Sequence, residues 1–151
     1  MKKTLLNEQD KNEIIERINR LTPETQRQWG KMDVGQMLAH CAKGLEMTLG
    51  DFKAMPAPFP MRIVGRLMKW VYTNEKPFRK NSPTDKSFLI SERKDFAAEK
   101  NRLIALLNRF YAGGESGITK NHHPFFGYFT PSEWSIGSYK HLDHHLRQFG
   151  A

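Results

Sequence analysis

All but one of the six histidines lie from position 122 onward, and two of them, His141 and His145, are spaced one helical turn apart. On a helical wheel of about 100° per residue, both imidazoles project from the border of an apolar arc. Rings at positions i and i+4 are about 6 Å apart along the helix axis, a spacing that allows two rings to chelate one cation. The alternative is a pair of partly buried histidines with ordinary hydrogen bonds.

The residues around this pair define the direction of the expected site. On the wheel, His144 falls on the side of Lys140 and Arg147, which we expect to face solvent, and Asp143 points away from the pair. The metalloprotease pattern His-Glu-x-x-His is excluded, because Leu142 stands where the glutamate would be. The pattern therefore offers a chelating pair without that class's general base.

A third ligand has to come from another helix, and His40 is the histidine that stands apart in the sequence. It lies at the border of an apolar arc centred near Cys41 and Leu45, and Gly44, one turn on, leaves space beside it. A lone histidine in such a place can simply be a hydrogen-bonded core residue. Opposite an i, i+4 pair, however, it would complete a three-nitrogen site of the kind that helical bundles build. Cys41 points about 100° away and is interpreted as packing.

The elements that must position these side chains are predicted to be helices, because no stretch shows the apolar–polar alternation of a half-buried strand. Asp33 with Gln36, and Thr130 with Glu133, form capping-box patterns before two of these helices. Residues 74–89 are expected to form a loop. The predicted helices cover about residues 7–20, 34–49, 61–72, 92–111 and 131–148. We expect an all-α fold, an antiparallel four-helix bundle whose long crossover carries the extra short helix, in a single domain over residues 1–151.

The charge balance has to be explained as well, since 24 Lys and Arg against 16 Asp and Glu give a formal net charge of +8. Much of the excess lies in the segment 62–80, where Arg62, Arg66 and Lys69 recur at helical spacing. The opposite side is apolar, with Ile63, Leu67, Trp70 and Val71. This pattern predicts the solvated face of an amphipathic helix. Contact with a membrane surface or nucleic acid is the alternative, but no nucleic-acid motif is found and we expect no nucleic-acid partner.

The sequence also bears on where the protein works. A single cysteine, Cys41, excludes an intramolecular disulfide and is typical of a reducing compartment. The start, MKKTLLNEQDK, becomes polar before the apolar core of a secretion signal can form. No apolar run approaches the roughly 18 residues needed to cross a bilayer. We therefore expect a cytoplasmic protein without a transmembrane segment.

Three segments of the chain together resemble the DinB-like superfamily, which includes maleylpyruvate isomerases and bacillithiol S-transferases. They are QWGKMDVGQMLAHC around Trp29, HPFFGYFTPSEW from His123, and the ending KHLDHHLRQFG. The resemblance covers essentially the whole chain, and the second phrase looks specific to a poorly characterised bacterial branch. The resemblance to this superfamily implies a four-helix bundle with a three-histidine metal site. Carried over by motif, the ligands are His40, His141 and His145.

The resemblance implies a function in less detail. Some members are metal-dependent thiol S-transferases, so the expected partners are a low-molecular-weight thiol and a small electrophilic molecule. Three imidazoles leave coordination positions open and suit zinc, nickel or iron alike. The alternatives are a non-catalytic metal- or ligand-binding bundle, and a protein that binds anionic surfaces through the segment 62–80. A homodimer is also left open.

His123 is the one candidate for a catalytic group outside the ligand set. It is followed by Pro124 and two phenylalanines, so it lies in an apolar loop that leads into the last helix. Its imidazole could be bonded to backbone in a loop that closes the end of the bundle. It could instead belong to the metal's outer shell or act as an acid–base group near an open position. The preceding His122 is interpreted as exposed loop.

Overall fold

The regular structure of the protein is helical. The computed structural model describes residues 2–82 and 85–151. Its α-helices are α1 (Glu8–Arg20), α2 (Val34–Leu49), α3 (Phe59–Leu67), α4 (Lys69–Thr73), α5 (Phe96–Gly113) and α6 (Pro131–Gln148), and its short 3-10 helices are η1 (Lys86–Phe88) and η2 (Gly114–Gly117). Within the described ranges no β-strand occurs, and His123 and Gly127 form an isolated bridge. The prediction of an all-α fold is confirmed.

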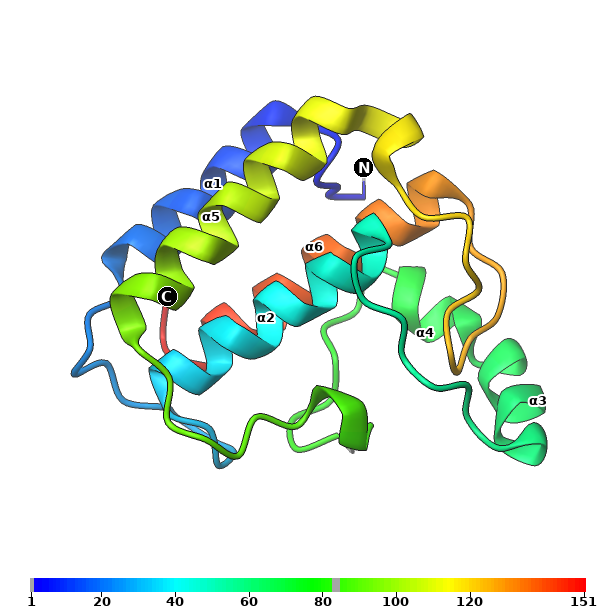
Figure 1. The fold of residues 1–151 in the computed structure, drawn as a ribbon, viewed down its shortest axis with the longest axis horizontal. Coiled ribbons are helices and arrows are strands. Elements are labelled where there is room, and N and C mark those ends of the chain that lie inside the picture. The colour runs from blue at the N-terminus through cyan, green and yellow to red at the C-terminus, as the bar shows by residue number, and fades with distance from the viewer. Residues whose placement is uncertain (1, 83–84) are drawn as a thin grey trace.

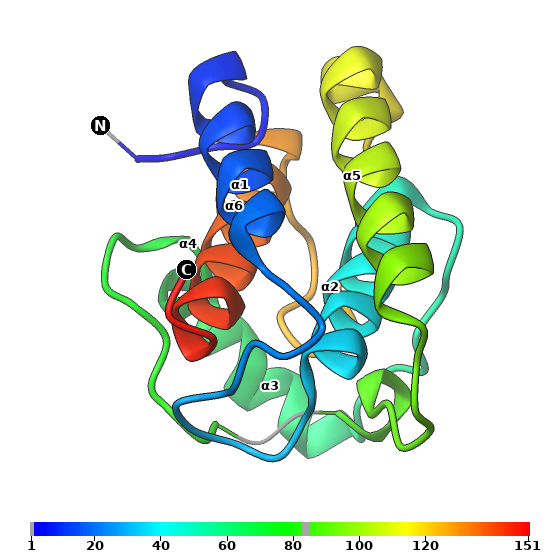
Figure 2. The ribbon, with the colours of Figure 1, turned by 90° about the vertical axis from the view of Figure 1, so that its left-hand side faces the viewer.

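Four long helices form the body of the molecule. Helices α1 and α2 each pack against both α5 and α6, as the two perpendicular views show (Figures 1 and 2). The space between them is filled by an apolar cluster in which Trp134 and Phe110 are the largest fully buried side chains. Cys41 lies inside this cluster, consistent with its predicted packing role. No helix in the described part of the chain is long and apolar enough to cross a membrane.

The directions of the helices differ from the antiparallel arrangement that we expected. Arg102 pairs with Glu46 and Arg109 pairs with Asp51, so α2 and α5 run in the same direction. Helices α1 and α6 are also parallel, whereas α1 with α5 and α2 with α6 are antiparallel (Figure 1). The cause is the crossover between α2 and α5, which is long enough to carry the chain back to the end at which α2 began. A short loop there would have forced these two neighbours to be antiparallel.

The two helices that carry the histidine candidates, α2 and α6, have the bounds that the sequence predicts. Asp33 accepts a hydrogen bond from the Gln36 N–H, and the Gln36 side chain accepts one from the Asp33 N–H. Thr130 and Glu133 form the same reciprocal pair at the start of α6. A cap of this kind stabilises a helix by about 1 kcal/mol and fixes the residue at which it begins. The register of the histidines on both helices follows from these starts.

Other bounds differ from the predictions. Helix α5 begins at Phe96 and not near residue 92, because the Asp95 side chain accepts the Ala98 N–H at 2.7 Å and acts as the cap. The short helix expected over residues 61–72 is two helices, interrupted at Met68. The first of them begins at Phe59, since Pro60 is tolerated in a first turn. The expected loop 74–89 contains η1.

Helix α3 does not bury its apolar side. Arg62 and Arg66 are exposed, as predicted for a basic face. The opposite side, however, is not covered: Ile63 and Leu67 of α3 are 49% and 74% exposed, and Trp70 of α4 is 60% exposed. Only Gly65 of α3 is buried. The predicted solvated basic face is therefore present, but the apolar side is exposed as well, because α3 extends from the body of the bundle (Figure 1).

Candidate metal centre

Three imidazoles from two helices meet between α2 and α6. One ring nitrogen of each of His40, His141 and His145 lies within 4.8 Å of those of the other two. The ring centroids are 4.6, 4.8 and 4.9 Å apart, a nearly equilateral triangle. Three imidazoles around a tetrahedral ion have centroids about 5 Å apart. The structure thus brings together the three residues that the sequence selected, in an arrangement that could hold a metal ion.

Two of the rings are oriented by hydrogen bonds on the side away from this triangle. His40 Nδ1 lies 3.0 Å from the Phe88 carbonyl oxygen, and His145 Nδ1 lies 2.9 Å from Gln148 Oε1. The Gln148 amide in turn donates to the Trp29 carbonyl at 2.8 Å, so its oxygen faces His145. Because both acceptors are oxygens without protons, each Nδ1 must donate. Each Nε2 therefore carries a lone pair and no proton, which is how metal-binding histidines are usually held.

These supporting groups were not found from the sequence. Gln148 could have been noticed, since it stands three residues after His145 and therefore on the same side of the helix. The Phe88 carbonyl belongs to the backbone at η1, and no residue type marks it. Its position depends on how the crossover folds back onto α2.

The third ring is held directly against the first. His40 Nε2 and His141 Nε2 are 2.9 Å apart, so one proton lies between them. Since His40 keeps its proton on Nδ1, His141 Nε2 is the donor in this contact. A cation at this point would take the place of that proton, and tetrahedral geometry would set the two nitrogens about 3.4 Å apart. The required movement is about half an ångström.

Burial keeps all three ligands neutral. It lowers the pKa of His145 from 6.5 to about 3, with a further contribution from His40. It also lowers the pKa of His40, and that of His141 well below its usual value, to which the neighbouring His145 and His40 add. Neutral imidazole is the form that binds metals. The additional proton of the cationic imidazolium form is therefore absent from all three rings at neutral pH.

A glycine makes room for His141. A Cβ atom at Gly44 would lie 3.2 Å from His141 Cε1 and 3.3 Å from its Nδ1, closer than side chains normally approach. The sequence predicted free space beside His40 at this position. That space exists, and it is filled by the ring of the partner helix.

The outward side of α6 is more covered than predicted. Lys140 and His144 were expected to face solvent, but Lys140 is buried and His144 is partly buried. The Lys140 ammonium donates to the Val71 carbonyl and to Asn74 Oδ1, and the His144 ring packs against Trp29 and Phe78. The cause is α4 and the segment after it, which lie over α6. His144 is nevertheless not part of the triangle.

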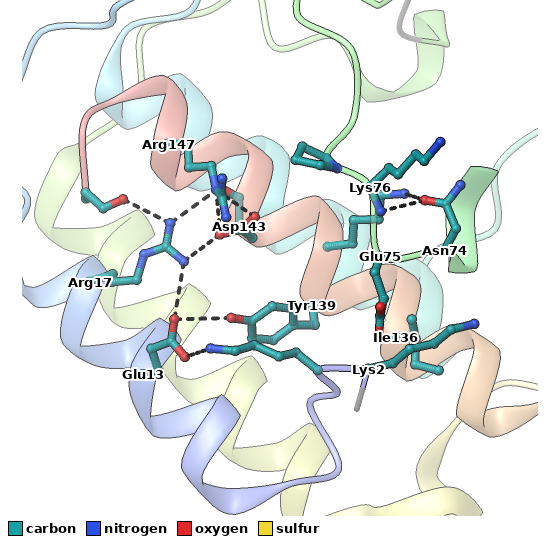
Figure 3. Close-up of a pocket in the computed structure, with 14 residues that line it drawn as sticks. Lys2, Glu13, Arg17, Asn74, Glu75, Lys76, Ile136, Tyr139, Asp143 and Arg147 are labelled. Carbon is teal, nitrogen blue, oxygen red and sulfur yellow. Dashed lines mark hydrogen bonds and ion pairs between the residues drawn. The ribbon is translucent and has the colours of Figure 1, made fainter. Parts of the chain in front are cut away.

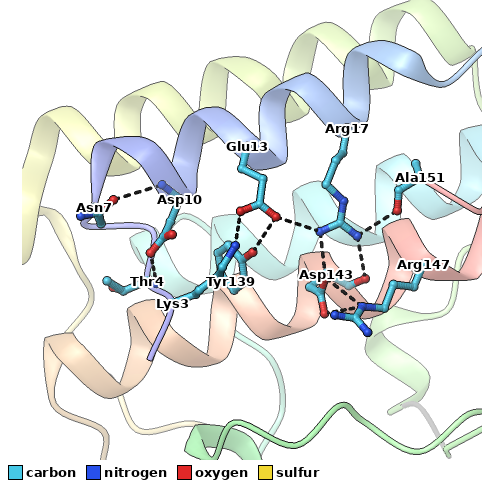
Figure 4. Close-up of polar contacts among 10 residues, drawn as sticks. All are labelled: Lys3, Thr4, Asn7, Asp10, Glu13, Arg17, Tyr139, Asp143, Arg147 and Ala151. Carbon is cyan, nitrogen blue, oxygen red and sulfur yellow. Dashed lines mark hydrogen bonds and ion pairs between the residues drawn. The ribbon is translucent and has the colours of Figure 1, made fainter. Parts of the chain in front are cut away.

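Asp143 points away from the histidines, as the wheel predicts. It accepts hydrogen bonds from Arg17 of α1 at 2.8 Å and from Arg147 one turn on (Figure 4). Arg17 also approaches Glu13, which accepts from the Tyr139 hydroxyl. This network ties α1 to the far side of α6. The acidic side chain nearest the ligands in sequence therefore has a structural partner and does not face the site.

A cavity of about 510 Å³ opens beside this network, between α1, α6 and residues 74–77 (Figure 3). Charges of both signs line it, and several are matched in ion pairs, such as Lys3 with Glu13 and Arg17 with Asp143. None of the three clustered histidines lines it. This cavity is therefore separate from the candidate metal centre.

His123 lies outside the triangle, in a cluster of aromatic rings. Its Nδ1 accepts the backbone N–H groups of Phe125 and Phe126 at 3.1 and 3.2 Å. Its ring packs against Tyr72 and Trp134, among others, and burial lowers its pKa to about 3. These are the contacts of an imidazole that holds its own loop in place. The adjacent His122 is exposed, as predicted.

Comparison with known proteins adds a family but no activity. One family model matches residues 1–151, and its description reads "Protein of unknown function (DUF1569)". No curated protein and no solved structure matches the chain. The function has to be argued from the arrangement of side chains itself.

Proposed function

Since the chain belongs to the DUF1569 family, whose function is unknown, we propose from the site itself that His40, His141 and His145 bind one divalent transition metal. The observation that carries this proposal is the orientation of the rings. Three neutral imidazoles converge, and two of them are fixed by Nδ1 hydrogen bonds that leave Nε2 without a proton. The donor set suits zinc, nickel or iron.

The resemblance to the DinB-like superfamily supports the same ligands by a different route. It selects His40, His141 and His145 by motif, without reference to distances. The geometry selects them without reference to any motif. Agreement between the motif and the geometry supports the ligand set more than either does alone, because a chance His-x-x-x-His spacing would have no reason to face a third histidine.

We further propose that the protein transfers a low-molecular-weight thiol to a small electrophile. A bound ion would supply the positive charge that lowers the pKa of a thiol at an open coordination position. The chain would contribute three neutral ligands, which leave coordination positions of a divalent ion for a substrate, and one of them, His141, is partly exposed. In the reaction, a carbon–sulfur bond forms, the bond to the leaving group breaks with its electron pair, and the thiol proton passes to solvent.

A non-catalytic metal-binding role is the second candidate. The observation that favours it is the environment of His123, the one acid–base group that the sequence suggested. Two backbone N–H groups occupy its Nδ1, and aromatic rings enclose it. A metal-binding protein without turnover would need no such group.

Metal titration tests the first proposal. Protein purified without a histidine tag is chelated, and zinc and nickel are then added in a calorimeter. We expect one equivalent to bind at neutral pH. Affinity weaker than about millimolar for both metals would remove the proposal, since three-histidine sites bind far more tightly.

A matched pair of variants locates the site. His145→Ala removes one of three inner ligands and should weaken binding by several orders of magnitude. His144→Ala changes the adjacent histidine on the same helix, which lies outside the triangle. It should weaken metal binding by at most about 10–100-fold, the loss typical of a residue that only supports a ligand. Loss of binding in His144→Ala alone would show that the ligand set is wrong.

Turnover separates the two candidate roles. The metal-loaded protein is mixed with a thiol, such as cysteine, and a chromogenic aryl chloride, and the rate is compared with that of His145→Ala. A metal-dependent rate supports the transferase. Equal rates in both proteins favour the binding role. A cytoplasmic location and a homodimer remain predictions, which cell fractionation and light scattering would test.

A further inference from the structure

A second cavity, of about 240 Å³, lies between the end of α2, helix α3 and the loop 119–127. Its buried lining residues are apolar or aromatic and include Met47 and Trp134. Its exposed lining residues include Lys53, Arg62 and Arg66. The cavity thus has an apolar interior and a cationic rim. Its volume lies below the roughly 300–1,000 Å³ of pockets that hold drug-sized ligands, so a matching ligand is small.

The positive charges at this rim are not matched by the protein. No aspartate or glutamate lines the cavity, and Lys53, Arg62 and Arg66 form no ion pair with any described residue. The Arg62 guanidinium carbon lies 5.7 Å from the centre of the Phe59 ring, a contact that leaves its charge available. The larger cavity of Figure 3 differs in this respect, because acidic side chains there pair with its arginines. The smaller cavity is therefore complementary to an anion.

Two of the lining residues, Trp134 and His123, carry a ring N–H group. The indole N–H of Trp134 is buried and has no hydrogen-bond partner, as is also true of Trp29 elsewhere in the described structure. The Trp134 nitrogen has almost no accessible surface, so Trp134 borders the cavity through its ring. His123 is the second donor: its Nδ1 accepts two backbone N–H groups, so the neutral ring carries its proton on Nε2.

The position of the arginines is fixed by close backbone contact. A Cβ atom at Gly65 would lie 2.0 Å from the Phe125 carbonyl oxygen, so only glycine allows α3 to lie against the loop. Gly127, at φ +79°, lies against the stem of Arg66, whose Nε would be 3.4 Å from a Cβ there. Gly65 thus places this part of α3 against the loop, and Arg62 and Arg66 on either side of it line the cavity, although the rest of α3 is exposed.

This cavity is distinct from the candidate metal centre. Met47 stands seven residues after His40 on α2, and Trp134 stands seven residues before His141 on α6. Seven residues of helix correspond to about 10 Å. The two sites therefore lie about two turns apart along the same antiparallel pair of helices, and each can be tested without the other.

We propose that this cavity binds a small organic anion, a carboxylate or a phosphate ester with an apolar body. The charged group lies against Arg62, Arg66 and Lys53 at the rim. The apolar body enters between Met47 and Trp134. Charge-assisted, bidentate contacts to guanidinium groups supply the recognition.

Nuclear magnetic resonance of ¹⁵N-labelled protein tests the proposal. Benzoate and phenyl phosphate are titrated separately, with benzyl alcohol as the uncharged compound of similar shape. Indole N–H signals are few, since the chain has three tryptophans, and Trp134→Phe assigns the relevant one. We expect the Trp134 signal to move saturably with at least one anion, with a Kd below about 1 mM, and benzyl alcohol to bind at least tenfold more weakly. The comparison of the two anions shows whether a carboxylate or a phosphate is preferred.

Variants at the rim complete the test. Arg62→Gln together with Arg66→Gln should weaken anion binding at least about tenfold, because each removes a charge-assisted contact. Arg93→Gln, an exposed arginine outside the cavity, should leave the Kd unchanged, and circular dichroism checks that each variant is folded. Equal binding of benzyl alcohol, an unaffected Kd in the double variant, or no saturable shift with either anion by 10 mM would each overturn the proposal.

Discussion

The buried histidines make the stability of the metal-free protein depend on pH in a defined direction. Burial lowers the pKa of His123 and His145 from 6.5 to about 3 and lowers those of His40 and His141 as well. Below pH 6.5 the unfolded chain takes up protons that the folded protein does not accept. The stabilisation is thus complete above the unfolded pKa and is lost as the pH falls from about 6.5 toward 3.

The size of the loss follows from these values. For one histidine that stays neutral when folded, lowering the pH from 7.5 to 5.5 decreases the free energy of unfolding by about 1.4 kcal/mol. His123 and His145 together therefore decrease the free energy of unfolding by about 3 kcal/mol over this pH range, and His40 and His141 add to this decrease. Domains of this size are stable by only about 5–15 kcal/mol, so the effect is large. Carboxylates contribute mainly at lower pH, because their unfolded pKa values are near 4.

Urea unfolding followed by circular dichroism at pH 7.5, 6.5 and 5.5, in the presence of a chelator, measures this loss. His123→Gln should reduce the pH dependence by about one proton, whatever it does to stability at pH 7.5. His122→Gln, the exposed neighbour, is the control and should leave the dependence unchanged. A free energy of unfolding that stays constant or rises between pH 7.5 and 5.5 would refute the reasoning.

Three further predictions concern packing and the metal centre. Gly137→Ala should lower the free energy of unfolding in urea by about 2 kcal/mol or more, because its Cβ would lie 1.7 Å from Tyr72 Cε1 and α4 would have to move. Gly44→Ala should weaken zinc binding at least tenfold in calorimetry with little loss of stability, since its Cβ would lie 3.2 Å from the His141 ring while alanine favours the helix by about 0.5–1 kcal/mol. Chelation should leave most of the helical circular dichroism signal in place, because the apolar core does not include the ligand histidines; loss of that signal would make the centre structural.

The parts of the fold that the sequence predicted well are those set by local interactions. The starts of α2 and α6 follow from side chains that cap their own helix within three residues. Once those starts are fixed, the wheel places His141 and His145 on one side and Asp143 on the other. The site was predictable for this reason, except for its outer partners.

The parts that were not predictable depend on contacts between distant segments. Nothing near Ile63 or Leu67 indicates that α3 would extend from the bundle with its apolar side exposed. Likewise, Lys140 looks like a surface residue until α4 is placed over it. The direction of α5 relative to α2 depends on the path of the crossover, and the helical spacing within segment 62–80 does not determine that path.

Because the ligand histidines come from distant parts of the chain, the rate at which a bound metal leaves them would report how often the site opens. His40 and His141 are 101 positions apart, and they meet only when α2 lies against α6. An ion held by all three rings cannot leave by fraying of one helix end, because both helices must part or a ring must rotate out of its hydrogen bond. The rate at which metal passes to a strong chelator would then be set by how often these helices separate or a ring rotates. Compared with backbone hydrogen exchange in the middle of α2, that rate would distinguish opening of the whole bundle from the motion of a single side chain.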